Sequence, residues 1–185
     1  MTLRSILAAS LLLLPLLATA HNFVDGQRVA PVGVADRGEL ILDKDKFSYK
    51  NWNSAQLAGK VRVVQHIAGR SSAKEKNANL IEAIKAAGFP HDRYQTTTIV
   101  NTDDAIPGTG MFVRNSIESN KSSSHGRNLS STATAWCGRP RQLDEKSSAI
   151  VVLDKNGRVQ WAKDGALTQQ EVQQVIDLLH KLLNK

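Results

Sequence analysis

The stretch GKVRVVQHIAGRSSAKEKNANLIEAIKAA, residues 59–87, decides the fold. Its first part, residues 61–67, is rich in β-branched side chains and predicts a buried strand. A turn at residues 69–72 leads into apolar positions that recur at helical spacing, which predicts a helix from about Ser72 to Ala87. Gly88-Phe89-Pro90 ends this helix. A buried strand that runs directly into a helix is the basic unit of an α/β domain.

Further strands are predicted on both sides of this unit. Residues 38–42 form a short apolar run, and residues 94–100 are rich in Thr and Ile. Residues 149–153 and 158–162 are predicted to pair as a hairpin across Lys155-Asn156-Gly157. The Asn-Gly pair in that turn supplies the positive φ values that a tight connection needs.

Two more helices are predicted. One is short and lies around Met111 and Ile117, after a loop at residues 101–110. The other begins after Thr168, which caps it, with Glu171 at the reciprocal position of a capping box. Strands that alternate with helices, followed by a hairpin and a final helix, predict an α/β domain with a mixed sheet flanked by helices. The apolar stripe of the final helix consists of Val172, Val175, Ile176, Leu179, Leu182 and Leu183.

Residues 1–20 have the layout of a secretory signal peptide. Arg4 is the charged start, residues 6–17 are the apolar run, and Ala18-Thr19-Ala20 provides small residues at the cleavage site. The apolar run is shorter than the ~20 residues that span a bilayer. We therefore expect export to the periplasm, cleavage before His21, and a mature chain of 165 residues (185 minus 20) without a membrane segment.

Charge and cysteine content narrow the possible functions. The formal charge of +7 falls to +6 when Arg4 is removed with the signal peptide. The basic residues are scattered among acidic ones and form no stripe, so we expect no nucleic-acid partner. Cys137 is the single cysteine, and it cannot form an internal disulfide in an oxidising compartment. Redox chemistry would therefore need a thiol from a partner.

The segment from Lys121 to Arg141 departs from the pattern of the rest of the chain. It holds five serines, four Lys or Arg and no acidic residue, where an α/β domain should offer another strand. One interpretation is a functional basic loop. The other is a pair of compensating frame shifts, because synonymous codons for HGRNLSSTATAWCG (residues 125–138) can be read in another frame as PWSQFIVDSNGVVR, an apolar strand with an Asn-Gly turn. In either case we expect the segment to be poorly ordered.

Several motifs resemble known families. Residues 26–31, 36–40 and 57–61 resemble the entry region of thioredoxin-like proteins of the peroxiredoxin and TlpA type. More closely, the chain outside residues 121–141 resembles the YtfJ family of exported bacterial proteins. This resemblance implies a periplasmic thioredoxin-like domain and carries no established activity. The motifs most similar to that family are Trp52-Asn53-Ser54-Ala55-Gln56-Leu57, Gln65-His66-Ile67-Ala68-Gly69-Arg70 and Gln160-Trp161-Ala162-Lys163-Asp164-Gly165-Ala166-Leu167-Thr168.

Two hallmarks of thioredoxins are missing from the sequence. The place of the thiol pair is taken by Ala68-Gly69-Arg70-Ser71-Ser72, and Ser147-Ser148 stand where a cis-proline is expected. Without a thiolate of low pKa there is no nucleophile for disulfide exchange. The sequence therefore predicts a redox-inactive module that binds a periplasmic protein or a small anionic ligand, with no cofactor.

The start of the helix after the first buried strand offers the main candidate site. Arg70, Ser71 and Ser72 are predicted to bind an anion, because free N–H groups and the helix dipole favour negative charge there. Ser71 and Lys74 also match the S-x-x-K pattern of an acyl-transfer serine. Ser72 and Glu75 match a capping box at the same place. An enzyme that uses Ser71, or a redox protein that uses Cys137, is the alternative function.

Metal-binding candidates are few. The mature amino terminus at His21 could chelate copper together with His66 or His91. His66 lies within the predicted strand and is better explained as a buried, hydrogen-bonded histidine. Asp103-Asp104 could contact a divalent cation, although two adjacent acids on a loop more often form a turn. We expect no metal site.

Overall fold

The structure, a computed structural model, describes residues 23–31, 33–43, 46–68, 71–101, 115, 119, 133–136 and 148–184. These residues form a two-stranded hairpin, a five-stranded sheet and three α-helices beside one 3-10 helix. No helix among them is long and apolar enough to cross a membrane. The elements are β1 (Gly33–Asp43), β2 (Lys46–Asn53), η1 (Ser54–Leu57), β3 (Val61–Ala68), α1 (Ser71–Glu75), α2 (Ala78–Ala87), β4 (Tyr94–Asn101), β5 (Ala133–Trp136), β6 (Ser148–Leu153), β7 (Val159–Asp164) and α4 (Gln169–Leu183).

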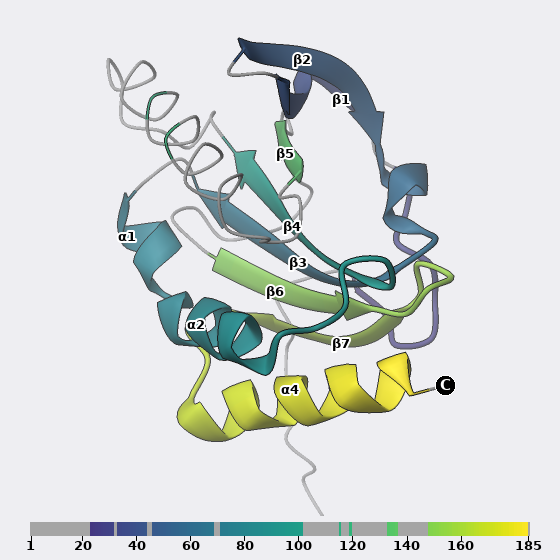
Figure 1. The fold of residues 1–185 in the computed structure, drawn as a ribbon, viewed down its shortest axis with the longest axis vertical. Helices are drawn as coiled ribbons and strands as arrows, with labels where there is room; N and C mark the ends of the chain where they lie inside the picture. Colours follow the sequence, from purple (N-terminus) through teal and green to yellow (C-terminus); the bar gives the residue numbers. More distant parts are fainter. Residues whose placement is uncertain are drawn as a thin grey trace, which may run out of the picture.

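The five-stranded sheet is mixed, with strand order β5-β4-β3-β6-β7. β3 pairs in parallel with β4, and β4 pairs in parallel with β5. β6 is antiparallel to both β3 and β7. Figure 1 shows α2 and α4 on one side of this sheet and the β1–β2 hairpin at the other end of the molecule. The prediction of an α/β domain with a mixed sheet and flanking helices is confirmed.

β3 is the central strand, and all eight of its residues are buried. Strands covered on both faces need apolar side chains at successive positions, which explains the run of β-branched residues. Alternate residues of β3 face opposite sides of the sheet. Val63 packs with α2 and α4, whereas Val64 packs with Trp52 of β2 and Leu57 of η1.

The core has three parts. The largest lies between the sheet and the two long helices, and it contains Val61, Val63, Leu80, Ile84, Phe89, Tyr94, Ile150, Val152, Val172, Val175, Leu179 and Leu183. The second lies on the opposite face and contains Trp52, Leu57, Val64, Ile99, Val151, Leu153 and Val159. The third is small and lies at the carboxyl end of β3, where Ile67, Ala68, Ala73 and Val100 meet.

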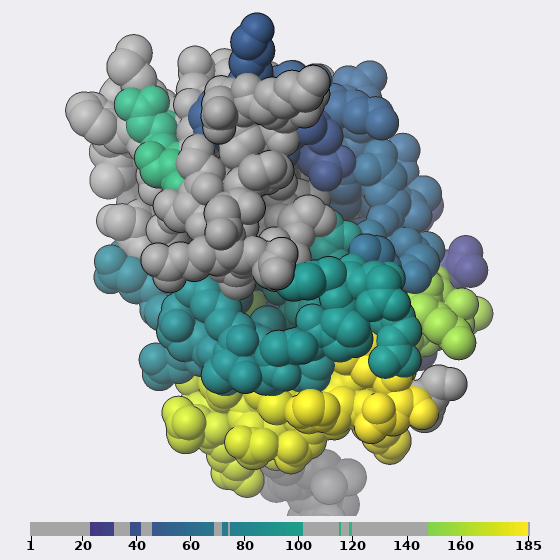
Figure 2. All heavy atoms as spheres, viewed as in Figure 1, coloured from purple at the N-terminus to yellow at the C-terminus, as the bar shows by residue number. Residues whose placement is uncertain are grey.

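The carboxyl-terminal half of the chain folds as predicted. β6 and β7 form the hairpin, with Gly157 at a φ of +74° in its turn. Thr168 caps α4, and Glu171 completes the capping box. Val175 and Leu179 of its apolar stripe are fully buried. Figure 2 shows α4 (yellow) packed directly against the segment that contains α2 (teal).

The single helix predicted from Ser72 to Ala87 is wrong, because the structure holds two helices. α1 ends at Glu75 and α2 begins at Ala78. Asn77, between them, turns its side chain into the protein instead of continuing the helix. Its amide bonds to other segments compete with helical geometry, which is how Asn interrupts a helix.

β1 and β2 form a separate antiparallel hairpin. The predicted strand at residues 38–42 is thus confirmed, but it is longer and pairs with a second strand that the sequence did not reveal. The pairing register shifts between Val34 and Glu39. Gly38 lies in this irregularity at a φ of +77°, and its backbone closely approaches Lys50. Only glycine fits there without strain.

Part of the anomalous segment forms a strand. Ala133–Trp136 is β5, which pairs in parallel with residues 97–100 of β4. This strand stands in the segment where the α/β pattern predicts one. The expectation that residues 121–141 are poorly ordered stays a prediction, since most of these residues lie outside the described ones. The rest of that segment, and the short helix predicted around Met111 and Ile117, lie outside the described residues, apart from isolated positions.

Candidate functional site

The candidate site lies at the carboxyl end of β3, where the strand leads toward α1. In α/β sheets, ligands bind outside the carboxyl ends of the parallel strands, which here are β3, β4 and β5. Ser71 is the first residue of α1, and Ser72 is exposed. Arg70 lies outside the described residues. Because α1 has only five residues, its dipole is small, so an anion site formed by Arg70, Ser71 and Ser72 would depend mainly on the charge of the arginine.

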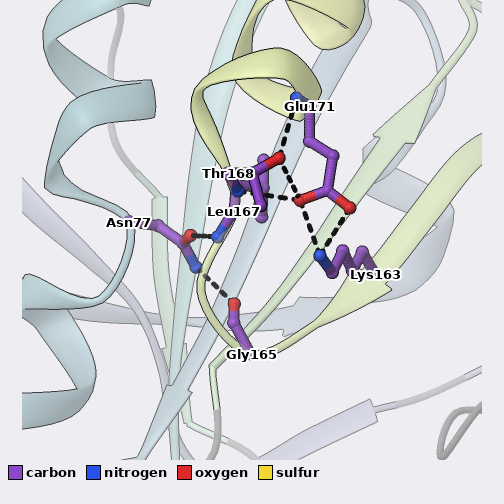
Figure 3. A network of polar contacts seen from close by, with 6 residues as sticks. All are labelled: Asn77, Lys163, Gly165, Leu167, Thr168 and Glu171. Carbon is purple, nitrogen blue, oxygen red and sulfur yellow. Dashed lines mark hydrogen bonds and ion pairs between the residues drawn. The ribbon is translucent and has the colours of Figure 1, made fainter.

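A buried amide joins three segments beside this end of the sheet. Asn77, which is 1% exposed, donates from Nδ2 to Ser148 Oγ and to the carbonyl oxygen of Gly165, each at 3.0 Å. Its Oδ1 accepts a hydrogen bond from the backbone N–H of Leu167 at 2.9 Å. Figure 3 shows this side chain reaching from the α1–α2 junction to the loop between β7 and α4. Asn77 therefore fixes the junction to β6 and to that loop.

Ser148 is the described member of the pair Ser147-Ser148, which stands where the resemblance to thioredoxins leads us to expect a cis-proline. It is the first residue of β6, is fully buried, and lies opposite Ile67 of β3. Its carbonyl oxygen also accepts a hydrogen bond from the N–H of Gly165 at 2.6 Å. With Asn77 bonded to its hydroxyl, Ser148 is part of a fixed polar contact.

The network continues onto the surface at the start of α4. Lys163 of β7 donates from Nζ to both carboxylate oxygens of Glu171, at 2.5 and 2.6 Å. Glu171 Oε2 also accepts a hydrogen bond from the backbone N–H of Thr168 at 2.8 Å. The bonds from Lys163 and Thr168 lower the pKa of Glu171 below its ordinary value. This part of the network stabilises the helix terminus and leaves no group poised for proton transfer.

A polar layer divides the helix-side core. On β3, Gln65 lies between Val63 of the large cluster and Ile67 of the small one. Gln65 is 5% exposed, and its Nε2 has no hydrogen-bond partner among the described residues. Thr98 of β4 lies directly opposite Gln65. Asn77 and Ser148 complete this layer.

The other face of the sheet carries a buried cation. Arg62 of β3 donates to the carbonyl oxygens of Gln56 and Leu57, and to the side chains of Gln95 and Thr97, at 2.6 to 3.1 Å. Burial lowers the pKa of the Arg62 guanidinium, while Glu39 of β1 acts in the opposite direction. The bonds to Gln56 and Leu57 tie η1 to the sheet, and those to Gln95 and Thr97 join β3 to β4, so Arg62 has a structural role.

His66 and His91, the two described candidates for a copper site, lie far apart. His66 is buried in β3, as predicted, and His91 is exposed on the turn after α2. The carbonyl of His91 accepts a hydrogen bond from Lys60, at the opposite end of β3 from His66. Six residues of extended strand separate the two places by roughly 20 Å. Within the described residues, no group of three potential metal ligands occurs.

Several predicted residues cannot be compared with the structure. Cys137, His21 and Asp103-Asp104 lie outside the described residues, and so do the side chains of Ser71 and Lys74. The acyl-transfer and thiol alternatives therefore remain predictions.

The sequence did not single out Asn77 or Gln65. Asn77 stood inside an otherwise regular helical pattern, where asparagine is a poor helix former, and this was the available signal. Gln65 was an uncharged polar residue within an apolar strand. Its burial could have been inferred from the strand, but the lack of a partner depends on the packing above it.

Comparison with solved structures identifies the fold class of this protein. A thioredoxin-like superfamily protein, SPOA0173, matches with a TM-score of 0.52 and 14% sequence identity, over 82% of this chain and 98% of that chain. At this identity the likeness concerns the fold alone. The arrangement of β3, α1 and β6 around the candidate site is thus that of a thioredoxin-like protein.

Sequence comparison identifies the family. The sequence profile of YtfJ_HI0045, described as a bacterial protein of unknown function, matches residues 23–182. The chain is 70% identical over 192 aligned residues to the uncharacterized protein YtfJ of Escherichia coli strain K12, covering 99% of this chain and 100% of that protein. It is 45% identical over 168 residues to an uncharacterized protein of Haemophilus influenzae, covering 88% and 89% of the two chains. The chain belongs to the YtfJ_HI0045 family, as its motifs predicted.

Proposed function

We propose that this protein is a redox-inactive thioredoxin-like module that binds a partner protein or a small anionic ligand in the periplasm. The observation that carries the proposal is the chemistry of the sheet end where thioredoxins hold their thiols. In this chain the corresponding segment, residues 68–72, contains no cysteine, and Ser148 stands in place of the proline with its hydroxyl bonded to Asn77.

The same residues argue against disulfide exchange. Exchange requires a thiolate that is accessible and stabilised by its surroundings. Cys137 is the single thiol in the chain and follows β5, the strand at the far edge of the sheet from β7. It has no second cysteine with which to complete a catalytic cycle.

The charge around the β3–α1 connection supports an anionic ligand. Residues 69–77 contain Arg70, Lys74 and Lys76 against a single acidic residue, Glu75. Such an excess of positive charge attracts anions and the acidic surfaces of other proteins. Arg70, Ser71 and Ser72 are the residues we propose to contact the ligand.

Titration of the amide chemical shifts tests this proposal. Phosphate, sulfate and acetate are added to the mature protein at constant ionic strength, and we expect saturable shifts at Ser71 to Lys74 in the millimolar range. Arg70→Ala should weaken these shifts and leave the melting temperature nearly unchanged, because a surface arginine contributes little to folding. Lys60→Ala, at the opposite end of β3, is the matched control. An absence of shifts, or identical shifts in Arg70→Ala, would remove the proposed site.

The location is part of the same proposal. The apolar run at residues 6–17 and the small residues at 18–20 support export and cleavage before His21. The intact mass of protein from the periplasmic fraction should correspond to a chain that starts at His21. A chain that starts at Met1 in the membrane fraction would contradict this location.

A further inference from the structure

We propose that the side-chain amide of Gln65, with the hydroxyl of Ser148, donates hydrogen bonds to a carboxylate that binds at the carboxyl end of β3 under α1. This inference rests on the proposed binding function and names the ligand chemistry and the buried contact. It follows from an amide whose hydrogen-bonding capacity the protein leaves unused.

The Gln65 side chain carries a buried hydrogen-bond donor without a partner. The side chain is 5% exposed, and Nε2 has no hydrogen-bond partner in the described part of the chain. A buried polar group without a partner destabilises the folded protein, and native proteins contain few of them. A hydrocarbon side chain of similar size would be favoured at this position if it served packing alone.

Gln95, the other buried glutamine among the described residues, differs from Gln65 because its side chain has a hydrogen-bond partner. Gln95 is 9% exposed on β4, and its Oε1 accepts a hydrogen bond from Arg62 at 2.6 Å. That glutamine has an evident structural role in holding a buried cation. Gln65, on the neighbouring strand and the opposite face, has no corresponding role.

Ser148 lies next to Gln65 in the sheet. Ser148 lies opposite Ile67, so it is the diagonal neighbour of Gln65 on the same face of the sheet. Its hydroxyl oxygen accepts a hydrogen bond from Asn77, and the hydroxyl O–H donates no hydrogen bond to another described residue. Gln65 Nε2 and the Ser148 hydroxyl therefore lie on the same face of the sheet, the face that α2 and α4 cover.

The unused donor and the basic residues nearby indicate the chemistry of the ligand. The group without a partner is a donor, Gln65 Nε2, so the ligand must supply an acceptor, and a carboxylate is an acceptor at both of its oxygens. The excess of basic residues in the 69–77 segment favours a charged acceptor over a neutral carbonyl.

Ligand entry requires α1 to move. This helix has five residues, and its Ala73 is 1% exposed against the small cluster at the end of β3. Asn77 is held by three hydrogen bonds and stays in place. We therefore expect the movement to be confined to α1, on the amino-terminal side of Asn77.

The first test compares the two buried glutamines by thermal unfolding without ligand. Gln65→Met should leave the melting temperature unchanged or raise it, because no hydrogen bond is lost. Gln95→Met should lower the melting temperature, because Arg62 loses an acceptor. A decrease for Gln65→Met as large as that for Gln95→Met would show a structural role for the amide and overturn the inference.

The second test follows the side-chain NH₂ signals of Gln65, assigned by their absence in Gln65→Met. Acetate should shift these signals saturably, and acetamide, its neutral analogue, should not. Gln65→Met should weaken acetate binding, followed at the backbone of Ser71 to Lys74, by about tenfold, the effect of a hydrogen bond to a charged group. Shifts at Ser71 to Lys74 without any at Gln65 would overturn this inference and leave the proposed function standing. No shifts at either place would contradict both.

Discussion

Asn77→Ala is expected to be among the most destabilising single substitutions in this protein. The side chain is 1% exposed and makes three hydrogen bonds, at 3.0, 3.0 and 2.9 Å, to Ser148, Gly165 and Leu167. Alanine removes all three bonds. Because the former partners lie at the meeting point of β6, α2 and the β7–α4 loop, water cannot replace the amide without loosening their packing.

The magnitude follows from these contacts. Each neutral hydrogen bond contributes about 1 kcal/mol net, and a buried partner left unsatisfied adds to the loss. The expected decrease in the free energy of unfolding is therefore about 3 to 4 kcal/mol, a large part of the 5 to 15 kcal/mol typical of a domain. Urea unfolding followed by circular dichroism measures it, provided that the slope of the transition is unchanged.

Asn79→Ala is the matched control. Asn79 lies two residues further along, is exposed, and belongs to α2. Its replacement should change the free energy of unfolding by no more than about 0.5 kcal/mol. A decrease below about 1 kcal/mol for Asn77→Ala, or equal effects of the two substitutions, would refute the role assigned to the Asn77 contacts.

Two further predictions concern the hairpin and the start of α4. Gly38→Ala places a Cβ against the carbonyl oxygen of Lys50 at a φ of +77°, so thermal unfolding should show a loss of roughly 3 kcal/mol, whereas Gly26→Ala, with the same φ and open space around it, should cost only about 1 kcal/mol. Equal losses would contradict the close approach. The pKa of Glu171 is lowered in the folded state by its bonds to Lys163 and Thr168, so its contribution to stability is present above the unfolded pKa, near 4.5, and is lost as the pH falls through the folded value. Glu171→Gln should flatten this acid dependence in denaturant titrations between neutral and acidic pH, and an unchanged dependence would count against the ion pair.

Much of the fold was predictable because its elements are encoded locally. The β-branched run of β3, the Asn-Gly turn between β6 and β7, and the Thr168–Glu171 capping box each specify their structure from adjacent residues. The hairpin of β1 and β2 was only half predicted. Its second strand shows alternation only over residues 46–50, where Phe47 and Tyr49 are half-buried between exposed polar residues, and the alternation breaks before the buried Trp52, so the signal was short.

The features missed at the candidate site depend on contacts between distant segments. Asn77 contacts residues 71 and 88 positions further along the chain. The lack of a partner for Gln65 can be recognised only when the packing of the helices over β3 is known. Spacing along the sequence reports periodicity but not which side chains meet, so neither feature could be derived from it.

The most direct measurement of the central claim is the reduction of insulin disulfides by the mature protein in the presence of a thiol reductant. The rate should equal the background rate without protein, and Cys137→Ser should leave it unchanged, because residues 68–72 supply no thiolate. A rate above background that disappears in Cys137→Ser would contradict the claim that this thioredoxin-like protein is redox-inactive.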